Sequence, residues 1–399
     1  MVGLTWVWSV WTRRPHGPTT TPPGWRWTLS SWLSKGYLQG KDERKKIFVH
    51  PENWYADHDV ELCLGTKVVG LDAAVHQVRL DDGSEIEYAK LLLATGSSPR
   101  RLPIPGIDLE GVRYLRRVED SEQLRADFRP GARIVVIGAG WIGLETAAAA
   151  RAAGAEVIVL EAADLPLLRV LGPEAAQVFA DLHRQNGVDL RYGVEIVEIT
   201  GSQGKADGVL LGHGGGRIPA DTVIVGVGVT PNTELAESAG LKVDNGIVTD
   251  EHLRTSAPDV YAAGDVANAF HPFYGKHIRV EHWANALNQP QTAAQSMLDP
   301  QEAVYDRLPY FYTDQFDLGM EYTGHVEPGG YARVVFRGDV GVREFIAFWL
   351  SSQGHVLAGM NVNVLDVSDQ IKALISSRTV VDPDALADPG VALESLLPG

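Results

Sequence analysis

Residues 132–161 constrain the fold of this chain more than any other segment. Residues 132–137 form a short apolar, β-branched run, which is typical of a buried parallel strand. The run leads into Gly138, Gly140 and Gly143, and an alanine-rich stretch with strong helix propensity follows. A second apolar run, residues 156–160, ends at Glu161. This order of strand, glycine turn, helix, strand and acid predicts a Rossmann unit that binds a dinucleotide.

Each residue of this pattern has a physical task. Gly138 allows a tight turn, Gly140 lets a pyrophosphate approach the backbone, and Gly143 lets the helix pack close to the strand. The N-terminus of the helix offers free N–H groups and a positive dipole end to phosphates. Glu161 is placed to accept hydrogen bonds from ribose hydroxyls. Its carboxylate would repel a 2′-phosphate, and the next two residues are alanines, so we expect NADH rather than NADPH.

Two further segments predict strands that end in small residues. The segment from Lys90 has the apolar run Leu91–Ala94 and ends at Thr95 and Gly96, and residues 255–263 lead into Gly264 and Asp265. Small residues let a ligand approach the backbone, and an aspartate there can accept hydrogen bonds from a polyol such as the ribityl chain of a flavin. Taken alone, each segment is equally compatible with an ordinary strand end or a helix N-cap.

Composition excludes several classes of function. The net charge of −16 argues against nucleic acid, which requires clustered cations. The only cysteine is Cys63, so the chain has neither a disulfide framework nor a C-x-x-C redox pair. There is no apolar run of about 18 residues, so we expect no membrane association and a cytoplasmic location. No histidine motif with metal-ligand spacing is present, and we expect no metal site.

From Leu33 to Gly399 the chain resembles the FAD- and NAD(P)-dependent ferredoxin reductases of bacterial monooxygenase and dioxygenase systems, within the pyridine nucleotide-disulfide oxidoreductase superfamily. The resemblance covers about nine tenths of the chain and is specific when its motifs are taken jointly. The motifs that carry it are residues 33–37, 94–100, 138–147, 226–232, 261–265, 280–286 and 309–315.

The resemblance implies an α/β fold with two Rossmann-like dinucleotide-binding domains and a small C-terminal α+β domain. An FAD-binding domain, residues 33–110 and 228–305, would be interrupted by an NAD-binding domain, residues 111–227. Residues 306–399 would form the C-terminal reductase domain.

The resemblance also implies site residues. Glu145 matches the acid that positions the nicotinamide over the flavin, and Lys35, in an otherwise apolar turn, would balance negative charge on the flavin. Val68 is also explained as strand core, and Trp283 as packing between domains. The residues expected to bind cofactors are Gly138, Gly140, Gly143, Glu161 and Gly228 for NAD, and Val68, Thr95, Gly96, Arg116, Asp265 and Trp283 for FAD.

Residues 1–32 depart from the family pattern. Six of the ten tryptophans lie here, among Pro15, Pro18, Pro22 and Pro23. The FAD fingerprint with which the family begins, a strand, a G-x-G-x-x-G turn and a helix, is missing. A disordered tail is one interpretation, and an abnormal coding start that replaced the fingerprint is the one we favour. In that case the written chain would bind NADH but hold FAD poorly.

The sequence therefore predicts a flavin-dependent NADH oxidoreductase. Electrons would pass from NADH through FAD to a [2Fe–2S] ferredoxin, a small acidic carrier that serves a monooxygenase or dioxygenase. One alternative is an NADH oxidase-type flavoenzyme, although Cys63 does not match an active-site cysteine. The other is a truncated NAD-binding product that cannot hold FAD.

Overall fold

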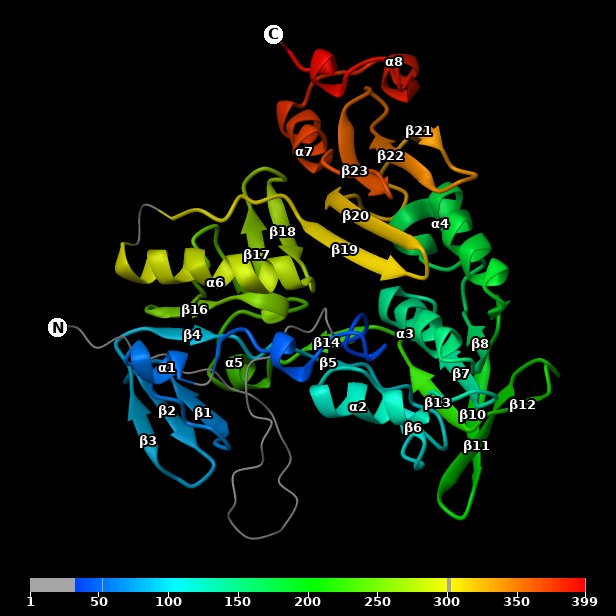
Figure 1. The fold of residues 1–399 in the computed structure, drawn as a ribbon. Coiled ribbons are helices and arrows are strands. Elements are labelled where there is room, and N and C mark those ends of the chain that lie inside the picture. Colours follow the sequence, from blue (N-terminus) through cyan, green and yellow to red (C-terminus); the bar gives the residue numbers. More distant parts are fainter. Residues whose placement is uncertain (1–32, 52, 300–302, 399) are drawn as a thin grey trace. The chain divides into compact units, whose positions relative to one another are not determined.

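A computed structural model describes residues 33–51, 53–299 and 303–398, and Figure 1 draws its helices and strands. The predictions for residues 1–32 lie outside the described residues. The described chain forms two compact units. The first unit contains Phe48–Ser98 and Val229–Arg307, and the second contains residues 33–47, Pro99–Gly228 and residues 308–398. Each unit is therefore assembled from segments that are far apart in the sequence.

A five-stranded parallel sheet lies at the centre of the second unit. Helix α3 (Trp141–Ala152) connects β7 to β8, α4 (Leu168–Gln185) connects β8 to β9, and α2 (Val118–Asp127) precedes β7. Four of the five residues of β7 and all four of β13 are buried, as expected for parallel strands covered on both faces. The predicted Rossmann unit is confirmed. In sheet order, the strands are β6 (Val112–Arg113), β13 (Thr222–Val225), β7 (Arg133–Ile137), β8 (Glu156–Leu160) and β9 (Asp189–Arg191).

An antiparallel meander, β10 (Ile196–Ser202), β11 (Lys205–Leu211) and β12 (Arg217–Pro219), follows β9 along the chain. The 3₁₀ helix η2 (Arg44–Ile47) also belongs to this unit.

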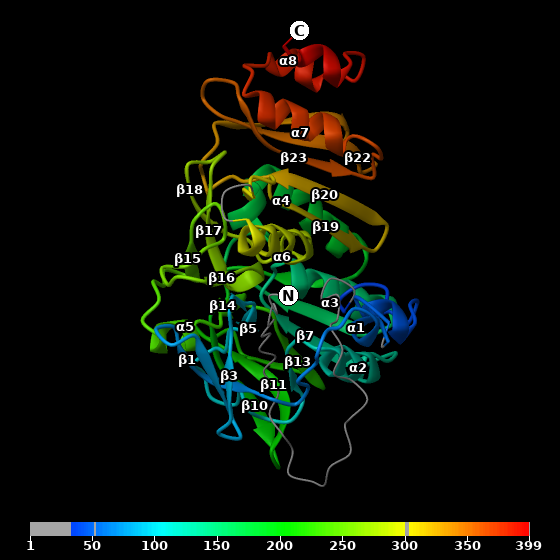
Figure 2. The same cartoon turned by 90° about the vertical axis from the view of Figure 1, so that its left-hand side faces the viewer.

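The C-terminal part of the second unit is an antiparallel sheet with helices. Figure 2 shows α7 (Ser368–Ser377) on one face of this sheet and α4 on the other. The short helices α8 (Pro383–Ala387) and η4 (Leu393–Leu396) complete it. The predicted C-terminal α+β domain is thus observed as a fold. In sheet order, the strands are β19 (Tyr310–Gln315), β20 (Leu318–Gly324), β23 (Val356–Val362), β22 (Glu344–Leu350) and β21 (Arg333–Asp339).

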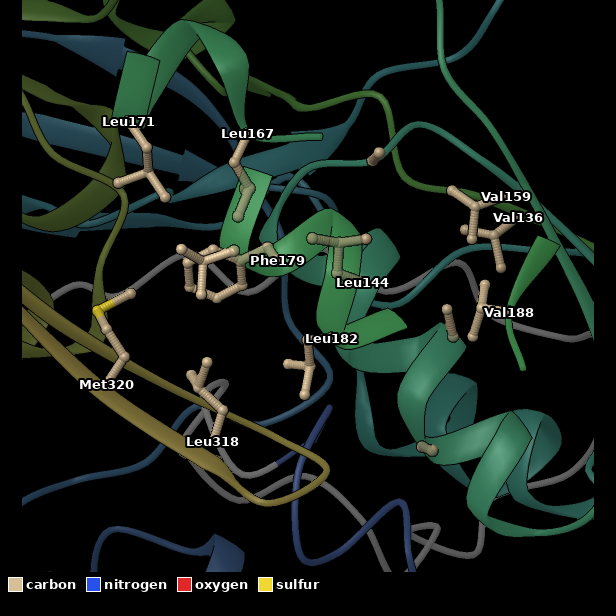
Figure 3. Close-up of a cluster of buried hydrophobic side chains, with 14 of the residues drawn as sticks. Val136, Leu144, Val159, Leu167, Leu171, Phe179, Leu182, Val188, Leu318 and Met320 are labelled. Carbon is tan, nitrogen blue, oxygen red and sulfur yellow. The ribbon is translucent and has the colours of Figure 1, made fainter. Parts of the chain in front are cut away.

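One hydrophobic core joins this sheet to the Rossmann helices. Phe179 and Leu182 of α4 lie opposite Leu318 and Met320 of β20 (Figure 3). Trp349 is fully buried in the same core, and its Nε1–H donates to the Leu171 carbonyl of α4 at 3.0 Å. The core therefore holds α3, α4 and the C-terminal sheet in fixed positions within the unit.

The described part of the first unit contains short strands and three α-helices. The predicted strands before Thr95 and Gly264 are observed as β4 (Leu91–Leu93) and β16 (Val260–Ala262), which pair in parallel and are buried throughout. The 3₁₀ helix η3 (Gly264–Val266) follows β16 directly. The other elements are β1 (Val68–Asp72), β2 (Gln77–Leu80), β3 (Glu85–Glu87), β15 (Ile247–Thr249), β17 (Ala267–His271), β18 (Lys276–Arg279), α1 (Trp54–Asp57), α5 (Glu234–Ser238) and α6 (Trp283–Leu298).

The strands β5 (Ser97–Pro99) and β14 (Val229–Pro231) pair with each other where the chain passes from one unit to the next. The predicted domain boundaries at residues 110, 227 and 305 stay a prediction.

Candidate functional site

The three glycines of the fingerprint stand in three different environments. Gly138 has φ of 97°, and a Cβ there would lie 2.5 Å from the Gly226 carbonyl oxygen. A Cβ on Gly143 would overlap the Gly138 carbonyl oxygen, so this position leaves no room for a side chain. At Gly140, in contrast, a Cβ would meet no described atom within 4 Å. This open position at the start of α3 is what a pyrophosphate needs in order to reach backbone N–H groups.

Glu161, directly after β8, faces the same loop. Its Oε2 accepts a hydrogen bond from the Ala139 N–H at 2.7 Å, and its Oε1 accepts one from the Ala163 N–H at 2.9 Å. These two bonds fix the carboxylate beside the fingerprint. Because a carboxylate offers about four lone-pair positions, Glu161 keeps acceptor capacity for ribose hydroxyls.

Glu145 lies in a buried polar cluster on α3. The side chain is 3% exposed and receives three hydrogen bonds. Lys35 Nζ donates to Oε1 at 2.7 Å, Thr313 Oγ1 donates to the same oxygen at 2.5 Å, and the Ser34 hydroxyl donates to Oε2. Lys35 and Glu145, which were predicted as site residues with separate roles, are therefore in direct contact, and the negative charge of Glu145 is compensated inside the protein.

Lys35 is held from two directions. Its ammonium group contacts Glu145 and also lies over the Tyr312 ring, 5.1 Å from the centroid. Only 9% of the residue is exposed. The turn that carries it is anchored to α2, because the Ser121 hydroxyl donates to the Leu33 carbonyl at 2.8 Å. Lys35 is thus almost fully buried and paired with an acid, but a small part of it stays exposed. A lysine in this position can present positive charge to an anionic ligand.

In the first unit, Asn232 holds the turn at Thr95 and Gly96 in place. Its side chain donates to the Thr95 carbonyl at 2.8 Å, and its backbone N–H donates to the Gly96 carbonyl at 2.9 Å. Thr95 Oγ1 donates in return to the Asn232 carbonyl at 2.6 Å. Gly96 has φ of 66°, which favours glycine. The turn is therefore rigid, as a ligand-binding backbone segment should be.

Asp265 is brought to the same region by the end of β16. The Ser97 hydroxyl, next to Gly96, donates to Asp265 Oδ2 at 2.8 Å, and Asp265 is only 8% exposed. The preceding Gly264 has φ of 79°, and its N–H donates to Gln289 Oε1 of α6 at 2.8 Å. The structure thus joins the two predicted ribityl-binding segments within one unit.

The remaining predicted residues have less specific surroundings. Val68 is buried in the hydrophobic core of the first unit, which agrees with its structural interpretation. Trp283 is half-buried at the first position of α6. Arg116 is half-buried and its backbone N–H donates to Asp120 at 2.9 Å. Gly228 has φ of 97°, and a Cβ there would meet nothing within 4 Å.

Sequence reasoning missed four residues that shape these clusters. Ser34 and Thr313 bind Glu145, Asn232 holds the Thr95 turn, and Gln289 binds Gly264. Ser34, Thr313 and Asn232 belong to motifs that carried the family resemblance, but the pattern gave them no task of their own. Across the described part of the chain, no group of acidic, histidine or cysteine side chains could hold a metal ion. The described helices also include none with the length and apolarity to cross a membrane.

A glycine-rich dinucleotide loop, an acid at the end of the next strand and a C-terminal antiparallel sheet define a pyridine-nucleotide oxidoreductase. The family model for pyridine nucleotide-disulphide oxidoreductases matches residues 19–290, and the model for the reductase C-terminal domain matches residues 310–397. The chain belongs to the pyridine nucleotide-disulphide oxidoreductase family.

Relatives in the family are similar over most of their length. The chain is 38% identical to putidaredoxin reductase of Pseudomonas putida, over 92% of this chain and 86% of the relative. It is 40% identical to the ferredoxin–NAD(+) reductase component of the anthranilate 1,2-dioxygenase system of Burkholderia cepacia, over 92% and 89%. Among solved structures, the covalent putidaredoxin reductase–putidaredoxin complex matches with a TM-score of 0.87 and 37% identity, over 92% of this chain and 88% of that chain.

Proposed function

We propose that this protein is an NADH-dependent ferredoxin reductase that uses FAD and reduces a [2Fe–2S] ferredoxin serving a monooxygenase or dioxygenase. The relatives that match over most of the chain are named as reductases of this kind. The single observation that carries the proposal for this chain is the buried contact of Lys35 with Glu145, five residues after the open position at Gly140. It places a carboxylate whose charge is compensated on the helix that would bind NADH.

The residues present fit NADH. The open backbone at Gly140 and Gly228 would admit the dinucleotide, and Glu161 would accept hydrogen bonds from the adenine ribose. The loop offers a 2′-phosphate no partner at the two alanines that follow Glu161. We therefore propose NADH as the preferred donor, with Glu145 orienting the nicotinamide.

The residues that would hold the flavin fit it in part. Asp265 is a buried acid beside a rigid glycine turn, which suits the hydroxyl groups of a ribityl chain. Lys35 would face the negative charge of the flavin. We propose Val68, Arg116 and Trp283 as further contacts with the flavin. When bound, the flavin accepts hydride from NADH and releases electrons singly. The protein itself orients the two ligands and excludes water around Glu145.

No cysteine pair is available to carry electrons, since Cys63 is the only cysteine and is exposed. Electrons would therefore leave a bound flavin directly for the external acceptor. We also propose that the reaction takes place in the cytoplasm. The division into an FAD-binding domain, an NAD-binding domain and a C-terminal reductase domain belongs to the same proposal.

The test begins with the visible spectrum and FAD content of the purified full-length chain. NADH-dependent reduction of a [2Fe–2S] ferredoxin and oxygen consumption are then measured on the same sample. FAD together with rapid ferredoxin reduction is the expected result. Rapid oxygen consumption without ferredoxin reduction would favour an NADH oxidase. NADH binding by protein that takes up no added FAD would favour a truncated NAD-binding product.

A further inference from the structure

A chain of buried hydrogen bonds leads from Glu145 to α4. Thr313 Oγ1 donates to Glu145, Gln315 Nε2 donates to Thr313 Oγ1 at 3.2 Å, and Gln315 Oε1 lies 2.8 Å from His183 Nε2. The exposed fraction is 3% for Glu145, 1% for Thr313, and zero for Gln315 and His183. Three elements contribute: α3 carries Glu145, β19 carries Thr313 and Gln315, and α4 carries His183.

Regular secondary structure explains why these side chains meet. Thr313 and Gln315 are two residues apart on β19 and therefore face the same side of the strand. Trp141 lies four residues before Glu145 on α3, and Phe179 lies four residues before His183 on α4, so each polar residue shares a helix face with an aromatic one. The rings of Trp141 and Phe179 pack at 5.5 Å. The polar chain is thus enclosed by apolar packing, where hydrogen bonds are strong and an unmade bond is costly.

The donors in this chain all point the same way. A carboxylate only accepts, so the single hydroxyl hydrogen of Thr313 is directed at Glu145. Thr313 must then accept from Gln315, which fixes the amide nitrogen of Gln315 toward Thr313 and its oxygen toward His183. His183 can satisfy that oxygen only by donating from Nε2. The charge of Glu145 therefore sets the orientation of every group in the chain.

His183 is the end of the chain. Its Nδ1 is buried and has no hydrogen-bond partner among the residues that the structure describes, which agrees with an unprotonated nitrogen. Burial lowers the pKa of His183 from 6.5 to about 4, against an opposing effect of the bond to Gln315. The ring is therefore neutral near pH 7, and it carries a single proton, which His183 Nε2 donates to Gln315 in this series of hydrogen bonds.

We propose that His183, Gln315 and Thr313 are positioning residues, which hold the Glu145 carboxylate in one orientation for the nicotinamide through a one-way chain of hydrogen-bond donors. This inference rests on the proposed function. Affinity for NADH comes mainly from the pyrophosphate and ribose contacts, whereas Glu145 acts on the reacting ring. Loosening Glu145 should therefore slow hydride transfer more than it weakens binding.

The first experiment determines the tautomer of His183 by ¹⁵N NMR of the imidazole in the full-length chain. The Nε2–H tautomer, with no titration between pH 5 and pH 8, is expected. In Thr313→Val the amide of Gln315 loses its fixed partner, so the His183 signals should shift although no atom of the ring is touched. An Nδ1–H tautomer in the unsubstituted protein, or unchanged His183 signals in Thr313→Val, would overturn the proposal. This measurement requires neither bound flavin nor activity.

The second experiment compares variants in single-turnover reduction by saturating NADH after loading with FAD. Thr313→Val should slow hydride transfer roughly tenfold, while the NADH dissociation constant changes less than threefold. Thr313→Ser keeps the hydroxyl and should recover the rate to within about twofold. Gln315→Met keeps the shape of the side chain without the amide and should also slow the step. Equal rates for the valine and serine variants would overturn the positioning role.

Trp349→Phe is the matched control. It removes another buried hydrogen bond between α4 and the C-terminal sheet, from Trp349 to the Leu171 carbonyl, without contacting Glu145. This substitution should lower thermal stability but leave the rate of hydride transfer within about twofold of that of the unsubstituted protein. If Trp349→Phe lost as much rate as Thr313→Val, the slower hydride transfer would result from a general loosening of the packing. If the unsubstituted protein fails to reduce ferredoxin, the proposed function fails, and the NMR result still decides the hydrogen-bond chain.

Discussion

Acid should destabilise this protein through His183. The ring is fully buried and its pKa is lowered to about 4 in the folded protein, from 6.5 for an ordinary histidine. Between these two values the unfolded chain binds the proton more tightly than the folded one, so the free energy of unfolding falls as the pH falls. At about 1.4 kcal/mol per pH unit, the contribution of His183 is complete above about pH 6.5, and about 3 kcal/mol of it is lost by pH 4.

Urea denaturation at several pH values between 7 and 4.5 measures this loss. Carboxylates contribute to the same pH range, so the informative quantity is the difference in unfolding free energy between the unsubstituted protein and His183→Gln. Glutamine can still donate to Gln315 but does not titrate, and the difference should shrink or change sign as the pH falls. His213→Gln is the control, because the His213 side chain is 87% exposed. A difference that stays constant from pH 7 to pH 4.5 would refute the argument.

Four further substitutions test the two cofactor regions. Gly140→Val should abolish NADH binding in titration while the melting temperature is kept, since a Cβ there meets nothing within 4 Å. Gly143→Ala should instead lower stability by roughly 1–3 kcal/mol in thermal melts, because the new methyl group would overlap backbone; a stable Gly143→Ala protein would contradict this packing. Glu161→Arg should shift the ratio of kcat/KM toward NADPH, and the lost bonds to the Ala139 and Ala163 N–H groups should also weaken NADH; an unchanged ratio would place the ribose elsewhere. Asn232→Ala should weaken FAD by roughly 1–3 kcal/mol in equilibrium titration, because buried polar groups of the Thr95 turn lose their partner; equal affinity would remove this turn from the flavin site.

The Rossmann unit could be predicted from sequence because its evidence is local. Strand, glycine turn, helix and acid follow one another within residues 132–161, and each glycine has a steric reason that the structure reproduces. Glu161 is a partial exception. Its position was predicted, but its hydrogen bonds to the Ala139 and Ala163 N–H groups depend on how the loop closes, which residue order alone does not specify.

The partners of Glu145 could not be derived in the same way. The resemblance gave Lys35 and Glu145 separate roles, and their contact was not predicted, because the two residues are 110 positions apart and no periodic pattern joins them. Thr313 is 168 positions away from Glu145, and its alternation with Gln315 indicates only that β19 has a buried face. That Thr313 and Gln315 on this face meet Glu145 of α3 and His183 of α4 follows from packing among three elements.

The interleaving of the two units has a consequence for how the protein is made. Among the described residues, the first unit runs from residue 48 to residue 307, while the second unit has segments before and after it and is completed last. On the ribosome, the Rossmann sheet can therefore be complete long before Thr313 joins Lys35 around Glu145. Contacts over such sequence separations slow folding and leave apolar surface exposed in the meantime. Loss of the last ninety residues would leave α4 without the apolar sheet that covers it.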